Sequence, residues 1–222
     1  AELWSIYQQL PEQSRYWLYQ ARSIDFNVVQ GERVLDIGSG QHPFPFATDL
    51  GDIAIDDNSY GRAGADFTRL AGRQVHECDV EGTNFSDKEF GFTFCSHVLE
   101  HTRDPQKACN ELMRISHRGY IECPSFSKDI WLNTAKISNH HWKVSAIKNT
   151  LIFHEYTRTE LEGLRSDLLM SMHCAPETER EKAFAALIYL KSRQLNVMFP
   201  WSGTFQVEVH WAPYDGVLSS AS

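Results

Sequence analysis

The chain has 222 residues and a formal net charge of −8, with 42% hydrophobic and 23% charged residues. At roughly 100–200 residues per domain, this length predicts a single domain, and the ordinary composition argues against wholesale disorder. An acidic chain without clustered lysine and arginine is not expected to bind nucleic-acid backbones as its main role.

The sequence predicts a cytoplasmic protein without a membrane span. No apolar run approaches the ~20 residues that a membrane helix needs. Residues 1–5 show no basic region followed by an apolar stretch, so no signal peptide is expected. The cysteines are scattered without CxxC spacing, which argues against a zinc knuckle or a disulfide framework and favours free thiols in a reducing cytosol. They are Cys78, Cys95, Cys109, Cys123 and Cys174.

The first half of the chain predicts strands that alternate with helices. Apolar and aromatic residues at helical spacing predict two short helices within residues 3–22, divided by Pro11. Residues 104–115 predict a further helix, because Asp104 suits the N-cap and Pro105 suits the first turn. Short runs predict strands at residues 34–37, 53–56, 75–79, 90–96 and 118–123. This alternation indicates parallel βαβ units in a doubly wound α/β sheet.

The pattern loosens after Pro124. Residues 142–145 and 150–153 are predicted to pair as a hairpin, with a turn at Lys148 and Asn149. The surrounding polar segment, rich in Ser, Asn, Lys, His and Trp, is expected to be an insertion over the sheet.

Three further elements are predicted near the C-terminus. Thr159 is the expected N-cap of a helix. Residues 176–195 predict a long amphipathic helix, and the alternation of residues 205–211 predicts a final, half-exposed strand.

The most informative segment is residues 34–40, VLDIGSG, in which a strand leads into a Gly-x-Gly turn. Such a turn lets the backbone come close to a ligand, although an isolated Gly-x-Gly is as often a turn with no ligand. A second predicted strand ends at Asp56, whose carboxylate can accept both hydroxyls of a ribose. Pro43 and Pro45 oppose the helix that a pyrophosphate site needs. A ligand with a ribose but no phosphates therefore fits better than NAD.

Residues 34–124 resemble class I S-adenosylmethionine (SAM)-dependent methyltransferases. Residues 34–40 look like the first motif of this class, 53–56 like the second strand with its ribose-binding acid, and 78–80 like the segment that contacts adenine. The stretch SHVLEHTRDP at residues 96–105 is similar to the VLEHxxDP motif of small-molecule methyltransferases. Residues 111–115 and 119–124 match the helix and strand that usually follow, whereas residues 125–222 carry no comparably sharp motif.

The resemblance implies one methyltransferase domain over residues 1–222, with a Rossmann-like, doubly wound, mostly parallel seven-stranded sheet. Helices are expected on both faces, with an inserted lid segment after the fifth strand. The expected parts are an N-terminal helical cap at 1–30, a SAM-binding core at 31–124, an acceptor-site insertion at 125–158, and C-terminal helices and a final strand at 159–222.

The resemblance also implies roles for individual residues toward SAM. Asp36 is expected to hold the methionine amino group, directly or through water, and Asp56 to bind the ribose hydroxyls. The backbone of Gly38, Ser39 and Gly40 is expected to face the methionine and ribose part. Asp79 is expected to accept from the adenine amino group, with the N–H of Val80 facing a ring nitrogen. His97 is expected near the sulfur.

Histidine is the natural general base at neutral pH, and His101, His140 and His141 are the candidate catalytic residues. His101 follows the fourth strand on the ligand side, but it can equally cap the next helix. His140 and His141 lie in the insertion and can equally form a packing cluster with Trp142. Imidazoles of His97, His101 and His140 suit Zn or Fe. His97 and His101 stand at HxxxH spacing, but no such spacing includes His140, so no metal is expected.

The predicted activity is SAM-dependent methyl transfer to a small or medium-sized polar acceptor, such as a sugar or a hydroxylated metabolite, by in-line displacement. The product of the donor is S-adenosylhomocysteine. Two alternatives remain open: a non-catalytic SAM-binding regulatory or scaffold domain, and a nucleotide-binding oxidoreductase. The sequence leaves the acceptor and the oligomeric state open.

Overall fold

The computed structural model describes residues 5, 15–57, 64–137, 139–164, 169, 172 and 176–213. The helix predicted before Pro11 lies outside these residues except for Ser5. Cys174 also lies outside them. Two sheets organise the fold: a six-stranded sheet in the order β3-β2-β1-β4-β5-β8 and a three-stranded sheet in the order β6-β7-β9. The sequence prediction of an α/β fold is confirmed, but the prediction of one seven-stranded sheet is wrong.

The large sheet is parallel except at one edge. Its strands are β1 (Val34–Ile37), β2 (Asp49–Asp52), β3 (Gln74–Glu77), β4 (Phe90–Ser96), β5 (Ser116–Pro124) and β8 (Asn196–Ser202). β1 pairs in parallel with both β2 and β4, whereas β8 pairs antiparallel with β5. The chain therefore starts in the middle of the sheet, moves out to β3 and returns to β4. This reversal creates a switch point at the carboxyl ends of β1 and β4, where ligands bind in such sheets.

The strand predicted at residues 53–56 is wrong, because β2 ends at Asp52. The connection from β1 is short, and pairing already begins where the N–H of Thr48 donates to the carbonyl of Val34, 2.9 Å away. Charged Asp49 and Asp52, both buried, interrupt the apolar run by which a buried strand is recognised. The apolar run of residues 53–56 instead follows the strand.

Aromatic side chains cover one face of the large sheet. Helix α2 (Arg15–Arg22) contributes Tyr16, which packs edge-on against Phe94 at 4.7 Å between ring centroids. Phe44 stacks on Phe94 at 4.1 Å and is fully buried. The proline-containing segment around Phe44 forms no helix, as Pro43 and Pro45 predict. One buried ring thus covers sheet surface that a helix covers in most βαβ units.

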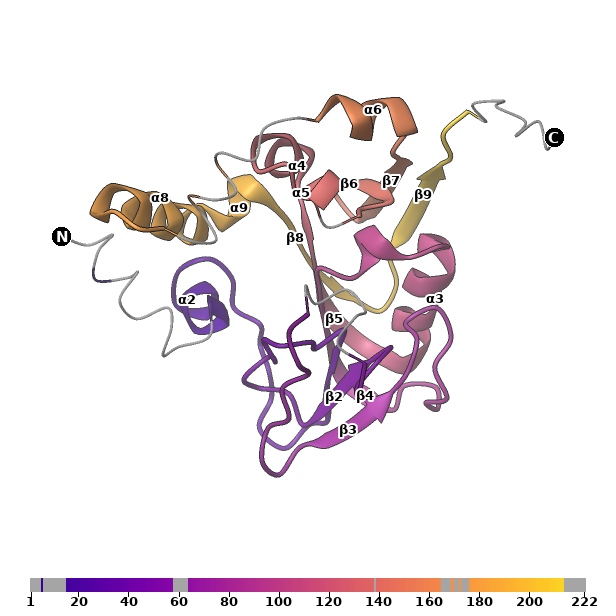
Figure 1. The fold of residues 1–222 in the computed structure, drawn as a ribbon. Helices are drawn as coiled ribbons and strands as arrows, with labels where there is room; N and C mark the ends of the chain where they lie inside the picture. The colour runs from indigo at the N-terminus through magenta and orange to yellow at the C-terminus, as the bar shows by residue number, and fades with distance from the viewer. Residues whose placement is uncertain are drawn as a thin grey trace.

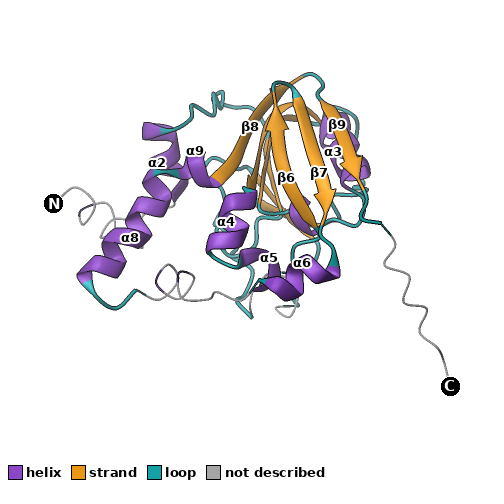
Figure 2. Ribbon diagram, turned by 90° about the horizontal axis from the view of Figure 1, so that it is seen from above, coloured by secondary structure: helices purple, strands orange, loops and turns teal. Residues whose placement is uncertain are grey.

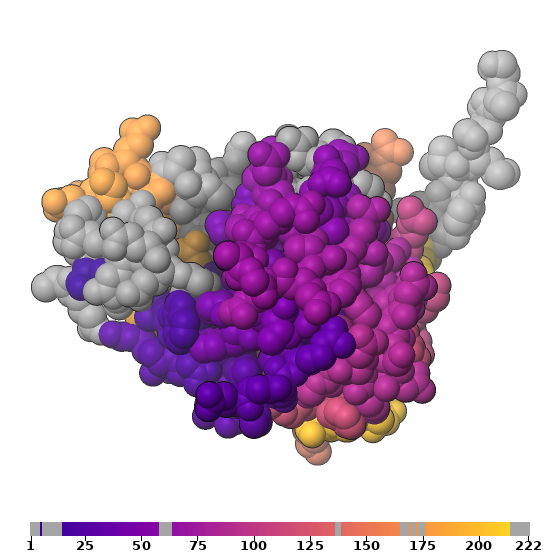
Figure 3. All heavy atoms as spheres, turned by 90° about the horizontal axis from the view of Figure 1, so that it is seen from below, coloured from indigo at the N-terminus to yellow at the C-terminus, as the bar shows by residue number. Residues whose placement is uncertain are grey.

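Helix α3 (Pro105–Ile115) covers the opposite face, together with the small sheet (Figure 1). Its N-cap is Asp104, whose carboxylate accepts from the N–H of Lys107 at 3.0 Å, as predicted. Seen from below, most of the described surface belongs to the first half of the chain, and the yellow C-terminal residues appear only at its margin (Figure 3).

The predicted hairpin is present as β6 (Trp142–Ile147) and β7 (Thr150–Glu155). Figure 2 shows this hairpin beside β9 (Gln206–His210), which pairs in parallel with β7. Trp142 and Phe153 belong to the same buried cluster as the α3 side of the large sheet. The hairpin thus contributes to the core, and the acceptor-site role of residues 125–158 stays a prediction.

Short helices connect these parts: η1 (Leu99–His101), α4 (Phe126–Trp131), α5 (Thr134–Ile137), α6 (Arg158–Gly163), α8 (Glu179–Leu190) and α9 (Ser192–Leu195). The N-cap of α6 is Thr157, with a capping box to Glu160, and not Thr159 as predicted. The single helix predicted at 176–195 is divided at Lys191, which leaves helical geometry with a ψ of 29°. Among the described residues, no helix has the length and apolar character to cross a membrane.

Candidate active site

A cavity of about 490 Å³ opens at the carboxyl ends of the first four strands. Residues that line it follow β1 (Gly38, Gly40), end β2 (Asp52), follow β3 (Asp79, Val80) and follow β4 (His97, His101). Asn139 and His141, which precede β6, complete one end. The cavity thus lies at the switch point of the sheet, the place where doubly wound folds bind ligands.

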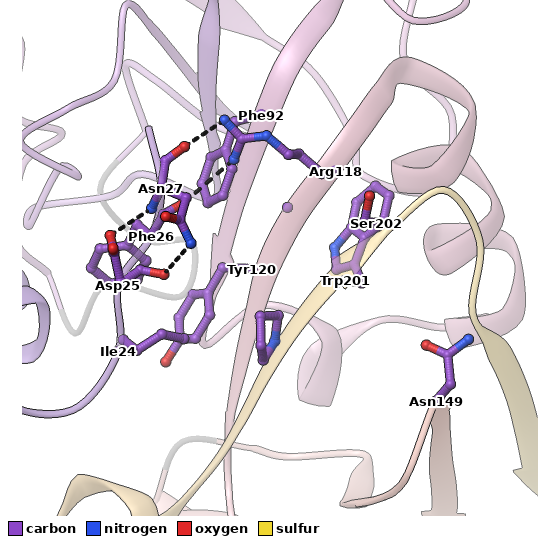
Figure 4. A pocket seen from close by; sticks show the side chains of 12 residues that line it. Ile24, Asp25, Phe26, Asn27, Phe92, Arg118, Tyr120, Asn149, Trp201 and Ser202 are labelled. Carbon is purple, nitrogen blue, oxygen red and sulfur yellow. Dashed lines mark hydrogen bonds between the residues drawn. The ribbon is translucent and has the colours of Figure 1, made fainter. Parts of the chain in front are cut away.

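A second cavity of about 310 Å³ lies at the amino ends of β4 and β5 (Figure 4). Arg118 crosses its wall, donating to the carbonyl of Asn27 at 2.7 Å and to Glu32 at 2.5 Å. These contacts join the sheet to the segment after α2. The cavity is at the wrong end of the strands for a βαβ ligand site, and we assign it a structural role.

The glycine turn joins the ends of β1 and β2. Gly38 has a φ of 75°, a conformation that L side chains rarely adopt. The N–H groups of Gly38 and Ser39 donate to the carbonyl of Gly51 at 2.8 and 3.0 Å. The N–H of Gly40 donates to Asp52 Oδ2 at 2.9 Å. Gly38 and Gly40 line the cavity, whereas Ser39 is buried beside it.

The acid at the end of β2 is Asp52, and sequence reasoning missed it. Its side chain is buried, and Asp52 lines the cavity. Asp56, the predicted ribose-binding residue, lies four residues later with 90% of its side chain exposed, and it pairs with Arg69 at 3.1 Å. Asp56 is not among the residues that line the cavity. The prediction of Asp56 rests on the second strand expected at residues 53–56, which the structure places at Asp49–Asp52.

Asp36 holds the proline-containing loop. Its Oδ2 accepts from the N–H of Phe44 at 2.7 Å, and its side chain is 2% exposed. Burial raises its pKa to about 7, although the hydrogen bond from Phe44 opposes this shift. Asp36 does not line the cavity directly. The structure therefore places it behind the turn, where it supports the loop that Gly38 begins.

Asp79 and Val80 lie together in the cavity wall, just after β3. Asp79 Oδ1 accepts from the N–H of Glu81 at 2.8 Å, which fixes the turn at the strand end. Their contact with adenine stays a prediction.

His97 lies between two fully buried carboxylates. Its Nδ1 is 3.1 Å from Glu100 Oε1, and its Nε2 is 3.3 Å from Glu122 Oε1. Burial raises the pKa of Glu100, but the contacts with His97 outweigh burial and hold that pKa at about 2. The pKa of Glu122 is lowered in the same way. The two carboxylates therefore fix the imidazole of His97 at the cavity wall, and no sequence pattern indicated Glu122.

The three candidate catalytic histidines gather at one end of the cavity. His101 and His141 line it, whereas His140 lies behind them, 5% exposed. The rings of His101 and His140 meet edge to face with 4.8 Å between centroids. The N–H of His141 donates to the carbonyl of Glu100 at 2.7 Å, which holds the pre-hairpin segment against η1. Partial desolvation of the ring lowers the pKa of His101, which favours a neutral imidazole at neutral pH.

Solved structures of several methyltransferases are similar to this chain at low sequence identity. A candidate methyltransferase from Haloferax volcanii, solved with the Trm112 methyltransferase activator, is 10% identical, with 90% of this chain and 97% of that chain covered and a TM-score of 0.47. A candidate methyltransferase from Bacillus halodurans is 15% identical, with 60% and 70% covered and a TM-score of 0.40. A SAM-dependent methyltransferase from Thermotoga maritima is 18% identical, with 73% and 78% covered and a TM-score of 0.38. Among curated proteins, none matched this sequence.

Residues 35–121 match the family model described as a methyltransferase domain. The match runs from β1 into β5 and so includes the glycine turn and most of the strand ends that line the cavity. Residues 35–121 therefore carry the methyltransferase domain that this family model describes.

Proposed function

We propose that the switch-point cavity binds SAM with its ribose on Asp52, its adenine at Asp79 and Val80, and its methionine part along the glycine turn toward His97. The position of Asp52 is the observation that carries this proposal. Asp52 is the buried acid at the end of β2, and its carboxylate accepts from the N–H of Gly40. A carboxylate at this position can accept from both ribose hydroxyls.

The charges in the cavity wall support a cationic, phosphate-free ligand. Asp52, Asp79 and Glu81 are carboxylates in the described lining, and Arg103 is the single guanidinium. Carboxylates repel a pyrophosphate, whereas SAM carries a sulfonium and an ammonium against a single carboxylate, together with neutral ribose and adenine groups. The volume also falls within the roughly 300–1,000 Å³ of small-molecule sites. The donor set of this chain thus fits SAM.

We propose that the acceptor is a small hydroxylated molecule that enters at the histidine end of the cavity. SAM supplies an electrophilic methyl group, so the protein must orient the acceptor oxygen behind it and exclude water. A hydroxyl must also lose its proton, and His141 is the proposed general base because it lines this end. Its position is fixed by the backbone contacts to Glu100 and Tyr156.

The first prediction tests this assignment with His141→Gln. Turnover of a hydroxylated acceptor, measured with methyl-labelled SAM, is expected to fall by roughly 10²–10⁴-fold, the usual contribution of a general base. SAM affinity, measured by calorimetry, is expected to stay unchanged. His117→Gln is the matched control, because His117 lies at the start of β5, at the opposite end of the parallel strands. Equal turnover of His141→Gln and the control would contradict the assignment.

A further inference from the structure

A cluster of three metal-ligating side chains lies at the histidine end of the cavity. Glu100, His101 and His140 each offer one ligand atom, and these atoms lie within 4.8 Å of one another. Glu100 and His101 belong to η1, whereas His140 comes from the segment before the hairpin. The hydrogen bond from the N–H of His141 to the carbonyl of Glu100 brings the two segments together. The proximity is therefore a product of the fold and not of sequence spacing.

The side chain of Glu100 gives the clearest indication that this cluster binds a cation. Glu100 is 0% exposed, and its Oε2 atom has no hydrogen-bond partner among the described residues. The thiol of Cys123 lies nearby, but a thiol is a weak donor. A buried carboxylate oxygen without a donor is costly, and native proteins normally satisfy such atoms. A cation at Oε2 would satisfy it.

Each of the three side chains is oriented by a different contact through its other polar atom. Glu100 Oε1 is occupied by His97, 3.1 Å away. His140 Nδ1 lies 2.9 Å from Asp129 Oδ1, which leaves its Nε2 to face the cluster. One ring nitrogen of His101 meets the backbone carbonyl of Asn139. Histidines that bind metals commonly hold their second nitrogen on a carboxylate or a carbonyl in this way.

The support for His140 is itself built into the core. Asp129 is 0% exposed and accepts three hydrogen bonds or contacts, from Thr134 at 2.6 Å, His140 at 2.9 Å and Tyr156 at 2.8 Å. Such a satisfied network fixes both the position and the tautomer of the imidazole. A histidine that serves only to fill space does not need this arrangement.

We infer that Glu100, His101 and His140 bind one divalent transition-metal ion, with zinc as the first candidate. Two imidazoles and one carboxylate are a donor set of catalytic zinc sites and also of non-haem Fe(II) sites. Tetrahedral zinc with bonds of about 2.1 Å places neighbouring ligand atoms about 3.4 Å apart. Each distance between two of these ligand atoms must therefore shorten by at most about 1.4 Å when zinc binds. Rotation of the more exposed His101 ring can supply this change.

The position of the ion assigns it a role that rests on the proposed function. Three protein ligands leave one coordination position open, and His101 lines the cavity, so this position faces the acceptor. An ion there acts as a Lewis acid that lowers the pKa of a bound hydroxyl. His101 and His140 then serve as ligands, and His141 alone remains as the base.

The inference is tested by Zn²⁺ titration of chelator-treated protein, with Co²⁺ as a spectroscopic probe. The expected result is one Zn²⁺ per chain and a visible Co²⁺ spectrum of low symmetry that Zn²⁺ abolishes. His140→Ala and Glu100→Gln are expected to weaken Zn²⁺ binding by at least tenfold, and Asp129→Asn by 10- to 100-fold. Because His140 is buried, His101→Ala serves as the variant least disruptive to folding, and circular dichroism checks each variant.

His154→Ala is the matched control. His154 stacks on His210 at 4.4 Å between centroids, on the exposed surface of the small sheet, and this pair is the rival site for surface-bound zinc. Zinc binding that survives His154→Ala and fails in His101→Ala supports the inference. The reverse pattern, or no Zn²⁺ or Fe²⁺ binding at all, overturns it. SAM affinity, measured in parallel, separates this failure from failure of the proposed function, because SAM binding does not require the ion.

Discussion

Gly38 stands at the point where the backbone leaves β1 for the ligand cavity. A Cβ at this residue would lie 2.1 Å from Cγ2 of Val98, and the φ of 75° is unfavourable for any L side chain. The close approach holds the glycine turn against the segment that carries His97. The backbone conformation of Gly38 and its contact with Val98 therefore both require glycine at this position.

Replacement of Gly38 by alanine is expected to lower the free energy of unfolding by about 2–5 kcal/mol, the sum of backbone strain and overpacking. SAM affinity is expected to fall as well, because the turn must move. Gly72→Ala is the control: its φ is 74°, but nothing lies within 4 Å of an added Cβ. Strain alone predicts a loss of about 1–2 kcal/mol there. If urea titrations gave both variants the same loss in free energy of unfolding, the side chain of Val98 would move aside without a measurable energetic penalty.

The resemblance to methyltransferases indicated cavity-lining residues where the predicted strand ends lay within two residues of the observed ones. Asp79, Val80, Gly38 and His97 follow strands that the apolar pattern identifies, and all four line the cavity. Asp52 could not be found in this way, because it ends a strand in which two of the four residues are aspartates. Such a strand is stabilised by its pairing with β1 and β3 and by the partners of its aspartates, none of which a local sequence pattern displays.

At the scale of elements, buried charge ties the first strands together. Asp49 in β2 accepts from Arg33 at 2.6 Å and lies 2.9 Å from Nε2 of His76 in β3. Burial raises the pKa of Asp49, but the hydrogen bonds from Arg33, Thr48 and His76 outweigh burial and lower that pKa below its usual value. The side chain of Asp49 is 2% exposed, whereas that of Arg33 is 42% exposed, so solvent partly screens this pair.

The lowered pKa of Asp49 predicts a pH dependence of stability. A carboxyl whose folded pKa is depressed stabilises the fold above its unfolded pKa of about 3.9, and this contribution is lost as pH falls through the folded pKa. Asp49→Asn is therefore expected to destabilise the protein at pH 7. The difference between the variant and the parent is expected to shrink as pH falls below about 4. Urea titrations across this range measure it, and a difference independent of pH would contradict the ionic role.

Elements with strong local signals could be predicted, and those set by tertiary pairing could not. Strand β4 and helix α3 match the predicted bounds closely, because an apolar run and an Asp N-cap define them locally. Strand β8 was missed, because Pro200 interrupts its sequence. Proline is tolerated there because β8 is an edge strand.

At the scale of the whole molecule, the hairpin and β9 form a second sheet that closes the α3 side of the core. The indole of Trp142 is 1% exposed, and its Nε1 donates to the carbonyl of Thr102 at 2.7 Å. This bond joins the hairpin to the segment between η1 and α3. Sequence patterns predicted the hairpin itself, but not the parallel pairing of β7 with β9, which joins residues 56 positions apart along the chain.

Trp142→Ala tests whether the hairpin is core or a detachable lid. Loss of a buried tryptophan is expected to reduce the free energy of unfolding by about 3–5 kcal/mol. Trp131→Ala is the matched control, because Trp131 on α4 is 59% exposed and its loss is expected to change stability by less than about 1 kcal/mol. A small effect of Trp142→Ala in thermal or urea unfolding would restore the lid interpretation.

Asp52 is the proposed ribose acid of the SAM site. Asp52→Asn keeps an oxygen for the N–H of Gly40 but removes the charge, so the loss of charge-assisted hydrogen bonds is expected to cost about 1.5–3 kcal/mol of SAM binding. This corresponds to a roughly tenfold to hundredfold weaker Kd. Asp56→Asn is the matched control and is expected to bind SAM as the parent does.

The decisive measurement is calorimetric titration of the parent and both variants with SAM, S-adenosylhomocysteine and NADH. We expect binding of the SAM pair alone, weakened in Asp52→Asn and unchanged in Asp56→Asn. Weakening in Asp56→Asn with Asp52→Asn unaffected, or preference of the parent for NADH, would contradict the account.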